Sequence, residues 1–168
     1  MTRIVLIRHG QALAYTEQIV AGHGCKGLSD HGRTQAELLR ERLANSHDYW
    51  VATIWPDGRP HVTPVWGAWI DDALWFSCGN NSRKARNLDR DPRCSIATSN
   101  AYEPVVLDAV AARVDAFEQF TDISNAKYEV DYSVDFFADN ALYAARPQSA
   151  FGLDEADFVG SPTRWRFT

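Results

Sequence analysis

The residues best suited to chemistry follow a short glycine-containing loop near the middle of the chain. Gly79-Asn80-Asn81 separates an apolar segment from Ser82, Arg83 and Lys84. Ser82 can act as the N-cap of a helix that runs to about Asp89, and the first turn of a helix leaves backbone N–H groups unpaired. These N–H groups, the helix dipole and two adjacent cations all favour an anion. The pattern predicts a phosphate site, and a solvated basic helix face is the alternative.

The distribution of charge supports an anionic ligand at this position. Residues 82–93 carry five basic and two acidic side chains, a local balance of +3, whereas the chain of 168 residues has a formal net charge of −5. A generic nucleic-acid binder needs an excess of Lys and Arg over a large face. We therefore expect no nucleic-acid partner.

The elements that position these residues begin with three strands joined by tight turns. Residues 49–55, 61–70 and 73–78 alternate with a period of two, which is typical of strands. They are separated by the turn-forming residues 56–60 and by Asp71-Asp72. The high aromatic content of 12% also favours β structure.

Further strands complete the prediction of a small barrel. Pro64 has no N–H to donate, so its strand must lie at an edge, at a bulge or beside something other than a strand. Residues 116–140 are ambiguous, with a possible helix followed by a polar loop. The remaining predicted strands are 93–99, 104–114, 141–146 and 164–167. A meander of five or six strands indicates a small barrel.

The first residues of the chain have a different pattern. Residues 3–7 form an apolar run that predicts a strand, and residues 15–28 predict a loop. Ser29 is a suitable N-cap for a helix at 32–44, in which Ala36, Leu39 and Leu43 share one face. The partner of strand 3–7 stays open: an exposed sheet edge, a second subunit, or none. The run is too short for a signal peptide and no segment approaches a membrane span, so we expect a cytoplasmic protein without a membrane partner.

Residues 47–99 resemble the core of the pyridoxamine-phosphate-oxidase-like split barrels. The similar pieces are ATIWPDGRPHVTPVW and LWFSCGNNSRKARNLDRDPRCSI, and the closing PTRWRF at 162–167 is also similar. The resemblance implies a mainly β fold, an FMN-binding split β-barrel with Greek-key-like connections and short helices, preceded by an N-terminal strand and helix. It further implies a homodimer whose interface binds FMN or, as the alternative, the deazaflavin F-420.

The same resemblance implies an oxidoreductase that transfers hydride to or from a small organic substrate, with a non-catalytic flavin-binding or redox-sensing module as the alternative. In such a site the protein supplies orientation and electrostatics, so we predict no catalytic side chain and no metal. The implied cofactor contacts are Thr63, Pro64, Val65 and Trp66 at the ring, Ser77 and Cys78 near the phosphate-bearing arm, Ser82, Arg83 and Lys84 at the phosphate, and Trp165 reaching the partner's cofactor. Cys78 departs from the hydroxyl residue that is common in the family.

Residues 1–44 resemble the opening of histidine phosphatases of the phosphoglycerate-mutase type. The similar pieces are MTRIVLIRHGQ and AGHGCKGLSDHGRTQAELLRERLA. The resemblance implies phosphorylation of His9 with Arg8 on the phosphoryl group. Such a phosphatase also needs a late histidine, yet no histidine follows His61. We therefore predict a truncated segment at 1–44 that is not an independent domain and a cofactor-binding barrel domain at 45–168, with phosphohistidine chemistry as a lesser hypothesis.

Overall fold

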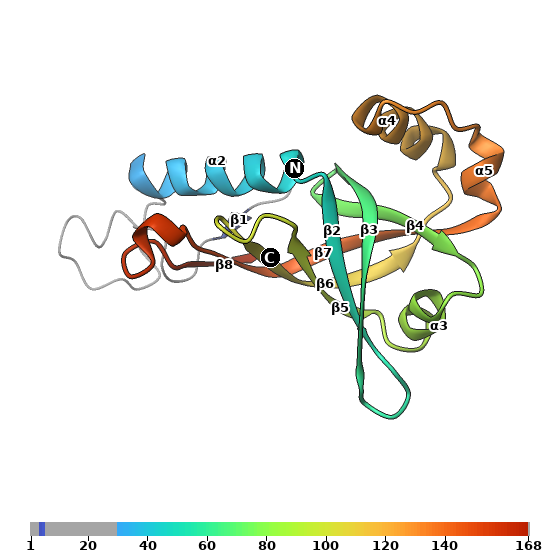
Figure 1. The fold of residues 1–168 in the computed structure, drawn as a ribbon, viewed down its shortest axis with the longest axis horizontal. Helices are drawn as coiled ribbons and strands as arrows, with labels where there is room; N and C mark the ends of the chain where they lie inside the picture. The colour runs from blue at the N-terminus through green and yellow to red at the C-terminus, as the bar shows by residue number, and fades with distance from the viewer. Residues whose placement is uncertain (1–3, 6–29, 168) are drawn as a thin grey trace.

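The computed structural model of the chain describes residues 4–5 and 30–167, which form a mainly β fold (Figure 1). One sheet contains eight strands: β1 (Ile4–Val5), β2 (Asp48–Ile54), β3 (Pro60–Ile70), β4 (Ala73–Gly79), β5 (Arg93–Thr98), β6 (Val105–Arg113), β7 (Asn140–Gly152) and β8 (Thr163–Phe167). The helices of this part of the chain are α2 (Asp30–Asn45), α3 (Arg83–Arg90), α4 (Phe117–Tyr128) and α5 (Val134–Ala138), with a 3₁₀ turn, η1 (Glu155–Asp157).

Six of the strands close into a barrel. They follow the antiparallel order β7-β4-β3-β2-β5-β6, and β6 pairs back with β7. Tight turns set the register of the sheet: Asp71 and Asp72 both have positive φ, at 48° and 61°, as a two-residue hairpin turn of type I′ requires. The predicted fold class, a mainly β barrel with short helices, is confirmed.

One edge of strand β7 pairs with two different strands along its length. Its residues 140–145 pair with β4, and its residues 149–152 pair with β8. Pro147 lies between the two stretches, where its missing N–H costs no ladder bond, and the register with β6 shifts there opposite Asp108 and Ala109. This switch carries the sheet beyond the barrel.

The extension ends with the first strand of the chain. Ile4 pairs with Phe167 and Val5 with Arg166, so β1 is the outer neighbour of β8. Of the partners left open for the predicted strand 3–7, the one observed is a sheet edge. The predicted loop 15–28, the N-cap Ser29 and the residues Arg8 and His9 lie outside the described residues.

Two hydrophobic cores share strand β4 because successive side chains point to opposite faces. Leu74 and Phe76 are buried inside the barrel. Trp75 faces outward and packs with Phe120 of α4 and Phe137 of α5. The second core therefore holds α4 and α5 on the outer face of β3 and β4, beside the loop that leads into α3 (Figure 1).

Helix α2 packs on the barrel with the apolar face predicted from the sequence. Leu39 and Leu43 are buried and Ala36 is half-buried. The Tyr49 hydroxyl of β2 donates to the Leu43 carbonyl. The helix predicted at 32–44 is confirmed.

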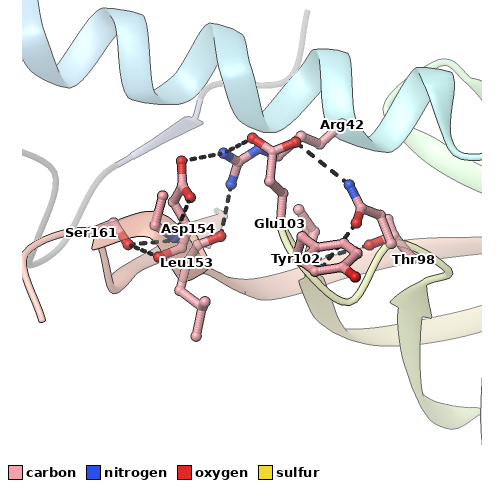
Figure 2. A network of polar contacts seen from close by, with 10 residues as sticks. Arg42, Thr98, Tyr102, Glu103, Leu153, Asp154 and Ser161 are labelled. Atoms are coloured by element: carbon pink, nitrogen blue, oxygen red, sulfur yellow. Dashed lines mark hydrogen bonds and ion pairs between the residues drawn. The ribbon is translucent and has the colours of Figure 1, made fainter. Parts of the chain in front are cut away.

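A polar network fastens α2 to the far end of the barrel (Figure 2). The Arg42 guanidinium lies 2.7 Å from a Glu103 carboxylate oxygen and 3.8 Å from one of Asp154. It also donates to the Leu153 carbonyl at 2.9 Å. One side chain thus links α2 to both the β5–β6 and the β7–β8 connections.

Two segments differ from the sequence-based expectations. The strand predicted at 141–146 continues to Gly152, because pairing with β6 and β8 overrides the break that Pro147 suggests locally. The ambiguous segment 116–140 forms α4 and α5. No helix of the described residues is long and apolar enough to cross a membrane.

Candidate functional site

Helix α3 begins as the sequence predicted. The Ser82 hydroxyl accepts from the Ala85 N–H at 3.1 Å and is the N-cap. The Ser82 N–H donates to the Gly79 carbonyl at 2.9 Å, which closes the turn between β4 and the helix. The first turn of α3 contains no acidic residue, so the positive end of the helix dipole is not neutralised locally.

Lys84 is the most informative residue of this turn. Its side chain is only 7% exposed, and its ammonium lies 5.9 Å from the centre of the Phe76 ring. Among the described residues no carboxylate lies within salt-bridge distance of Lys84. Burial lowers the pKa of Lys84, although the nearby Cys78 thiol acts in the opposite direction. A buried cation without a counterion is costly, so this position favours an anion supplied by a ligand.

Arg83 is held by an aromatic ring instead of a carboxylate. Its guanidinium carbon lies 4.0 Å from the centre of the Trp55 ring, where the cation is attracted by the ring face. Arg59 approaches the same ring at 4.9 Å. Trp55 follows β2 directly, so the β2–β3 hairpin fixes the position of the Arg83 side chain at the start of α3. The sequence analysis missed this role of Trp55.

The remainder of α3 is anchored to the barrel by polar contacts. Asp89 makes two parallel bonds of 2.9 Å with the Arg113 guanidinium of β6 and accepts from the Tyr143 hydroxyl at 2.8 Å. The buried Asn87 amide donates to the Thr53 hydroxyl of β2 at 3.0 Å. These bonds fix the direction of α3 and hence the position of its first turn.

The predicted ring contacts lie on the part of β3 that has a free edge. β3 pairs with β2 over its residues 60–66 but with β4 only from Gly67 onward, so Pro64 lies at an edge, one of the three positions that the sequence left open for it. Val65 is a core residue, and the buried Thr63 hydroxyl has no hydrogen-bond partner in the described part of the chain. Trp66 is exposed and stacks on Tyr128 of α4, with 4.4 Å between ring centres and 7° between planes.

Tyr128 and its neighbour Lys127 lock α4 against the β2–β3 pair. The Tyr128 hydroxyl accepts from the Gly67 N–H at 2.7 Å and can donate to the His47 carbonyl at 2.8 Å. The Lys127 ammonium donates to the Ser46 and Gly67 carbonyls at 2.7 and 2.8 Å. The sequence analysis missed both residues, because their segment was ambiguous and their partners are far away in the chain.

A cavity of about 230 Å³ lies where α4 and α5 meet the end of β4. Three of the predicted cofactor contacts, Trp66, Ser77 and Cys78, line it. Its aromatic lining residues are Trp66, Phe120, Tyr128, Tyr132, Phe136 and Phe137. Because Ser82–Lys84 follow Cys78 by only a few residues, the cavity and the first turn of α3 adjoin the same end of β4.

Trp165, the last of the predicted cofactor contacts, does not line this cavity. It lies on β8, is 4% exposed and belongs to the barrel core. Its ring packs against Gly152, where an added Cβ would lie 3.4 Å from the indole. Almost no surface of Trp165 is left for a ligand in this chain.

A second cavity, of about 350 Å³, lies between α2 and the β5–β6 connection. Its lining includes Glu41, Arg42 and Glu103, and Arg42 is already paired with Glu103 (Figure 2). None of the predicted cofactor contacts lines this larger cavity. The first turn of α3, where Arg83 and Lys84 form no ion pair with the described residues, is therefore the better candidate site for an anionic cofactor.

Comparisons with known families give two matches. A family model described as pyridoxamine 5'-phosphate oxidase matches residues 36–155. A second, described as histidine phosphatase superfamily (branch 1), matches residues 4–53. A search of curated proteins finds no match.

Several solved structures share the fold. A conserved hypothetical protein from Mycobacterium tuberculosis is 25% identical with a TM-score of 0.65, over 81% of this chain and 91% of that one. A heme binding protein from Mycobacterium smegmatis is 25% identical with a TM-score of 0.61, over 79% of this chain and 57% of that one. A protein described as an F420 reductase is 24% identical with a TM-score of 0.56, over 66% of this chain and 94% of that one.

Proposed function

The chain belongs to the pyridoxamine 5'-phosphate oxidase family, and we propose that it is an oxidoreductase that holds a phosphorylated flavin or deazaflavin at the first turn of α3. The observation that carries this proposal is the buried Lys84 ammonium, which has no carboxylate partner among the described residues. A phosphate would supply the missing counterion.

The residues present at this end of the barrel fit such a cofactor. Lys84 and Arg83 would hold the phosphate through charge-assisted bonds, with the unpaired N–H groups at the start of α3 as further donors. Residues 63–66, on the free edge of β3, would lie beside the ring system. The phosphate-bearing arm would pass Ser77 and Cys78. We do not include Trp165 in this site.

When bound, a flavin or deazaflavin supplies hydride transfer. The residues of the chain would bind and orient the cofactor. Lys84 and Arg83 would anchor its charged arm. Trp66 would offer it a flat aromatic face, whose orientation is fixed by stacking on Tyr128. The helices α4 and α5 would shield one side of the adjoining cavity from solvent. FMN is the proposed cofactor, with F-420 as the alternative because a protein of the same fold is described as an F420 reductase.

We propose a homodimer in which a second copy covers the outer face of the barrel. Trp50, Val62 and Val106 lie on this face and all are exposed. They belong to β2, its neighbour β3, and β6, which is separated from β2 by β5. Ile54 and Val110 extend the exposed apolar surface. Monomers rarely leave such a contiguous apolar surface in water, and Trp66 borders it, so a second copy would lie close to the proposed cofactor.

Haem binding is the second candidate function, favoured by the likeness to the heme binding protein from Mycobacterium smegmatis. Haem iron requires an axial ligand, usually His, Cys, Met or Tyr. Of the residues lining the smaller cavity, Cys78 and the two tyrosines are of these types. The unpaired cation at Lys84 fits a phosphate more directly, so the flavin proposal comes first.

The visible absorption spectrum of the purified chain, recorded before and after addition of FMN, F-420 or haem, tests the cofactor. The proposal expects saturable binding of FMN or F-420. Oxidation of the reduced cofactor by an enone or a redox dye then separates an enzyme from a non-catalytic sensor. Binding of haem alone would contradict the proposal.

A further inference from the structure

The smaller cavity, between α4, α5 and the end of β4, has an aromatic and uncharged lining. Six of its ten lining residues are aromatic, and none is acidic or basic. This contrasts with the first turn of α3 close by, where the cations Arg83 and Lys84 have no carboxylate partner among the residues that the structure describes. A charged group would lose hydration in the cavity without finding a counterion.

The aromatic walls are already organised without a ligand. Tyr132 and Phe136 stack with 4.3 Å between ring centres and 10° between planes, and Phe137 meets Phe120 edge-on at 5.0 Å. On the other side Trp66 is stacked on Tyr128. Rigid aromatic surfaces bind planar rings at little entropic cost. Trp66 and Phe136 are exposed, so the cavity has an entrance at the surface.

One polar group in the lining lacks a partner. Ser124 is 3% exposed, and its hydroxyl makes no hydrogen bond with any of the described residues. A buried serine or threonine inside a helix usually donates to the carbonyl four residues earlier, as Thr121 does to Phe117 at 2.7 Å. Ser124 does not, although the same helix offers it that option. A buried hydroxyl without a partner is costly. Ser124 lines the cavity while its hydroxyl oxygen is buried, so a turn of the side chain toward the cavity would let the hydroxyl bond to a polar atom of a ligand.

We infer that this cavity binds the substrate, an uncharged planar aromatic molecule that carries a polar atom for the Ser124 hydroxyl. The substrate role rests on the proposed oxidoreductase function, whereas the binding itself does not. A cavity of about 150 Å³ holds benzene, so about 230 Å³ accommodates one ring with substituents or two fused rings. The phosphate-bearing substrate that the family description suggests would find no cation in this lining.

Calorimetric titration of the full chain with 2-naphthol and with 2-naphthoate tests the inference. Both probes have the same two rings, and only the second carries a charge. We expect 2-naphthol to bind roughly tenfold or more tightly than 2-naphthoate, because the carboxylate must be desolvated. Equal affinity for the two probes, or no binding of 2-naphthol, would overturn the inference.

Two substitutions at Ser124 and one control locate the probe. Ser124→Met fills the cavity and should abolish binding of 2-naphthol. Ser124→Ala keeps the cavity open and should weaken binding roughly fivefold, the effect of one hydrogen bond. The control Ser95→Ala, on the exposed face of β5, should bind as the unmodified chain does. Unchanged affinity in both Ser124 variants would place the probe elsewhere and overturn the inference.

The same titration with FMN and F-420 separates this inference from the proposed function. Binding of 2-naphthol by a chain that binds neither cofactor would support the cavity and refute the oxidoreductase. Binding of a cofactor by a chain that ignores 2-naphthol would do the reverse.

Discussion

The ammonium of Lys84, in the first turn of α3, lies 5.9 Å from the centre of the ring of Phe76, in β4. Phe76 is fully buried, so the cation rests on the apolar core at one side, and no carboxylate of the part of the chain that the structure describes pairs with it. The neighbouring Arg83 is likewise held by a ring, that of Trp55. Two cations positioned by aromatic contacts keep their hydrogen-bond donors available for a ligand.

The pH dependence of cofactor binding should report on Lys84. Burial lowers its pKa from the ordinary value of 10.5, and only the protonated amine attracts a phosphate. The free chain therefore loses this attraction as the pH rises through the lowered pKa. We expect the ratio of FMN affinity to riboflavin affinity to fall before pH 10.5 is reached. Lys84→Met should give a low ratio that does not change with pH, and a flat profile in the unmodified chain would count against the site.

Gly67 should tolerate no side chain. An added Cβ would lie 2.9 Å from the Trp75 carbonyl oxygen and 3.1 Å from Leu74 Cδ1. We expect Gly67→Ala to lower the free energy of unfolding by about 1–3 kcal/mol, as overpacking does, measured by urea denaturation. Gly79→Ala is the matched control, because its nearest atom is 4.0 Å away. Equal losses in both variants would show that the close approach at Gly67 is not the cause.

A charge on the outer face should separate the proposed dimer. Val62 is 52% exposed on β3 and belongs to the apolar surface that a second copy would cover. We expect Val62→Glu to convert a dimer to a monomer in light scattering of the chain as it elutes from a sizing column. Val159→Glu is the control, since Val159 is exposed on the β7–β8 connection. A monomer in the unmodified chain, or dissociation by both variants, would contradict the proposed interface.

Much of the fold could be predicted from local patterns. Alternating residues and turn sequences predicted β2, β3 and β4, and the capping pattern predicted α3 at Ser82. These features depend on neighbours in the chain, so they are visible in the sequence. The continuation of β7 beyond Pro147 was missed, because it depends on pairing with β6 and β8.

The site was predictable only in part for the same reason. The charges of Arg83 and Lys84 are evident from the sequence, but their lack of carboxylate partners within residues 30–167 is a property of the folded chain. The stacking of Trp66 on Tyr128 joins residues 62 positions apart, as the numbering shows. No periodic or spacing signal indicates such a pair. Trp165 also differs from its sequence-based expectation: its place between two arginines suggested an interface, whereas within this chain it is buried in the barrel core.

His9 should be dispensable for cofactor binding. His9 belongs to the segment that matches the histidine phosphatase family, yet the chain has no histidine after His61 to complete such a site. We expect His9→Ala to leave the affinity for FMN or F-420 unchanged. We also expect a trap for phosphohistidine to find no stable phosphoenzyme. A phosphoenzyme that disappears in His9→Ala would revive phosphoryl chemistry in this chain.

The most direct test compares FMN with riboflavin, which differ only in the phosphate, in three forms of the chain. In the Arg83→Ala/Lys84→Ala variant we expect the preference for FMN over riboflavin to fall by about 2–4 kcal/mol, from two charge-assisted bonds that are partly solvated and not additive. The affinity for riboflavin should be nearly unchanged, and the control Arg86→Ala, an exposed cation of the same helix, should keep the preference. If F-420 is the cofactor that binds, the same comparison uses its phosphate-free form. A preference for the phosphorylated form that is equal in all three chains would contradict a phosphate site at the first turn of α3.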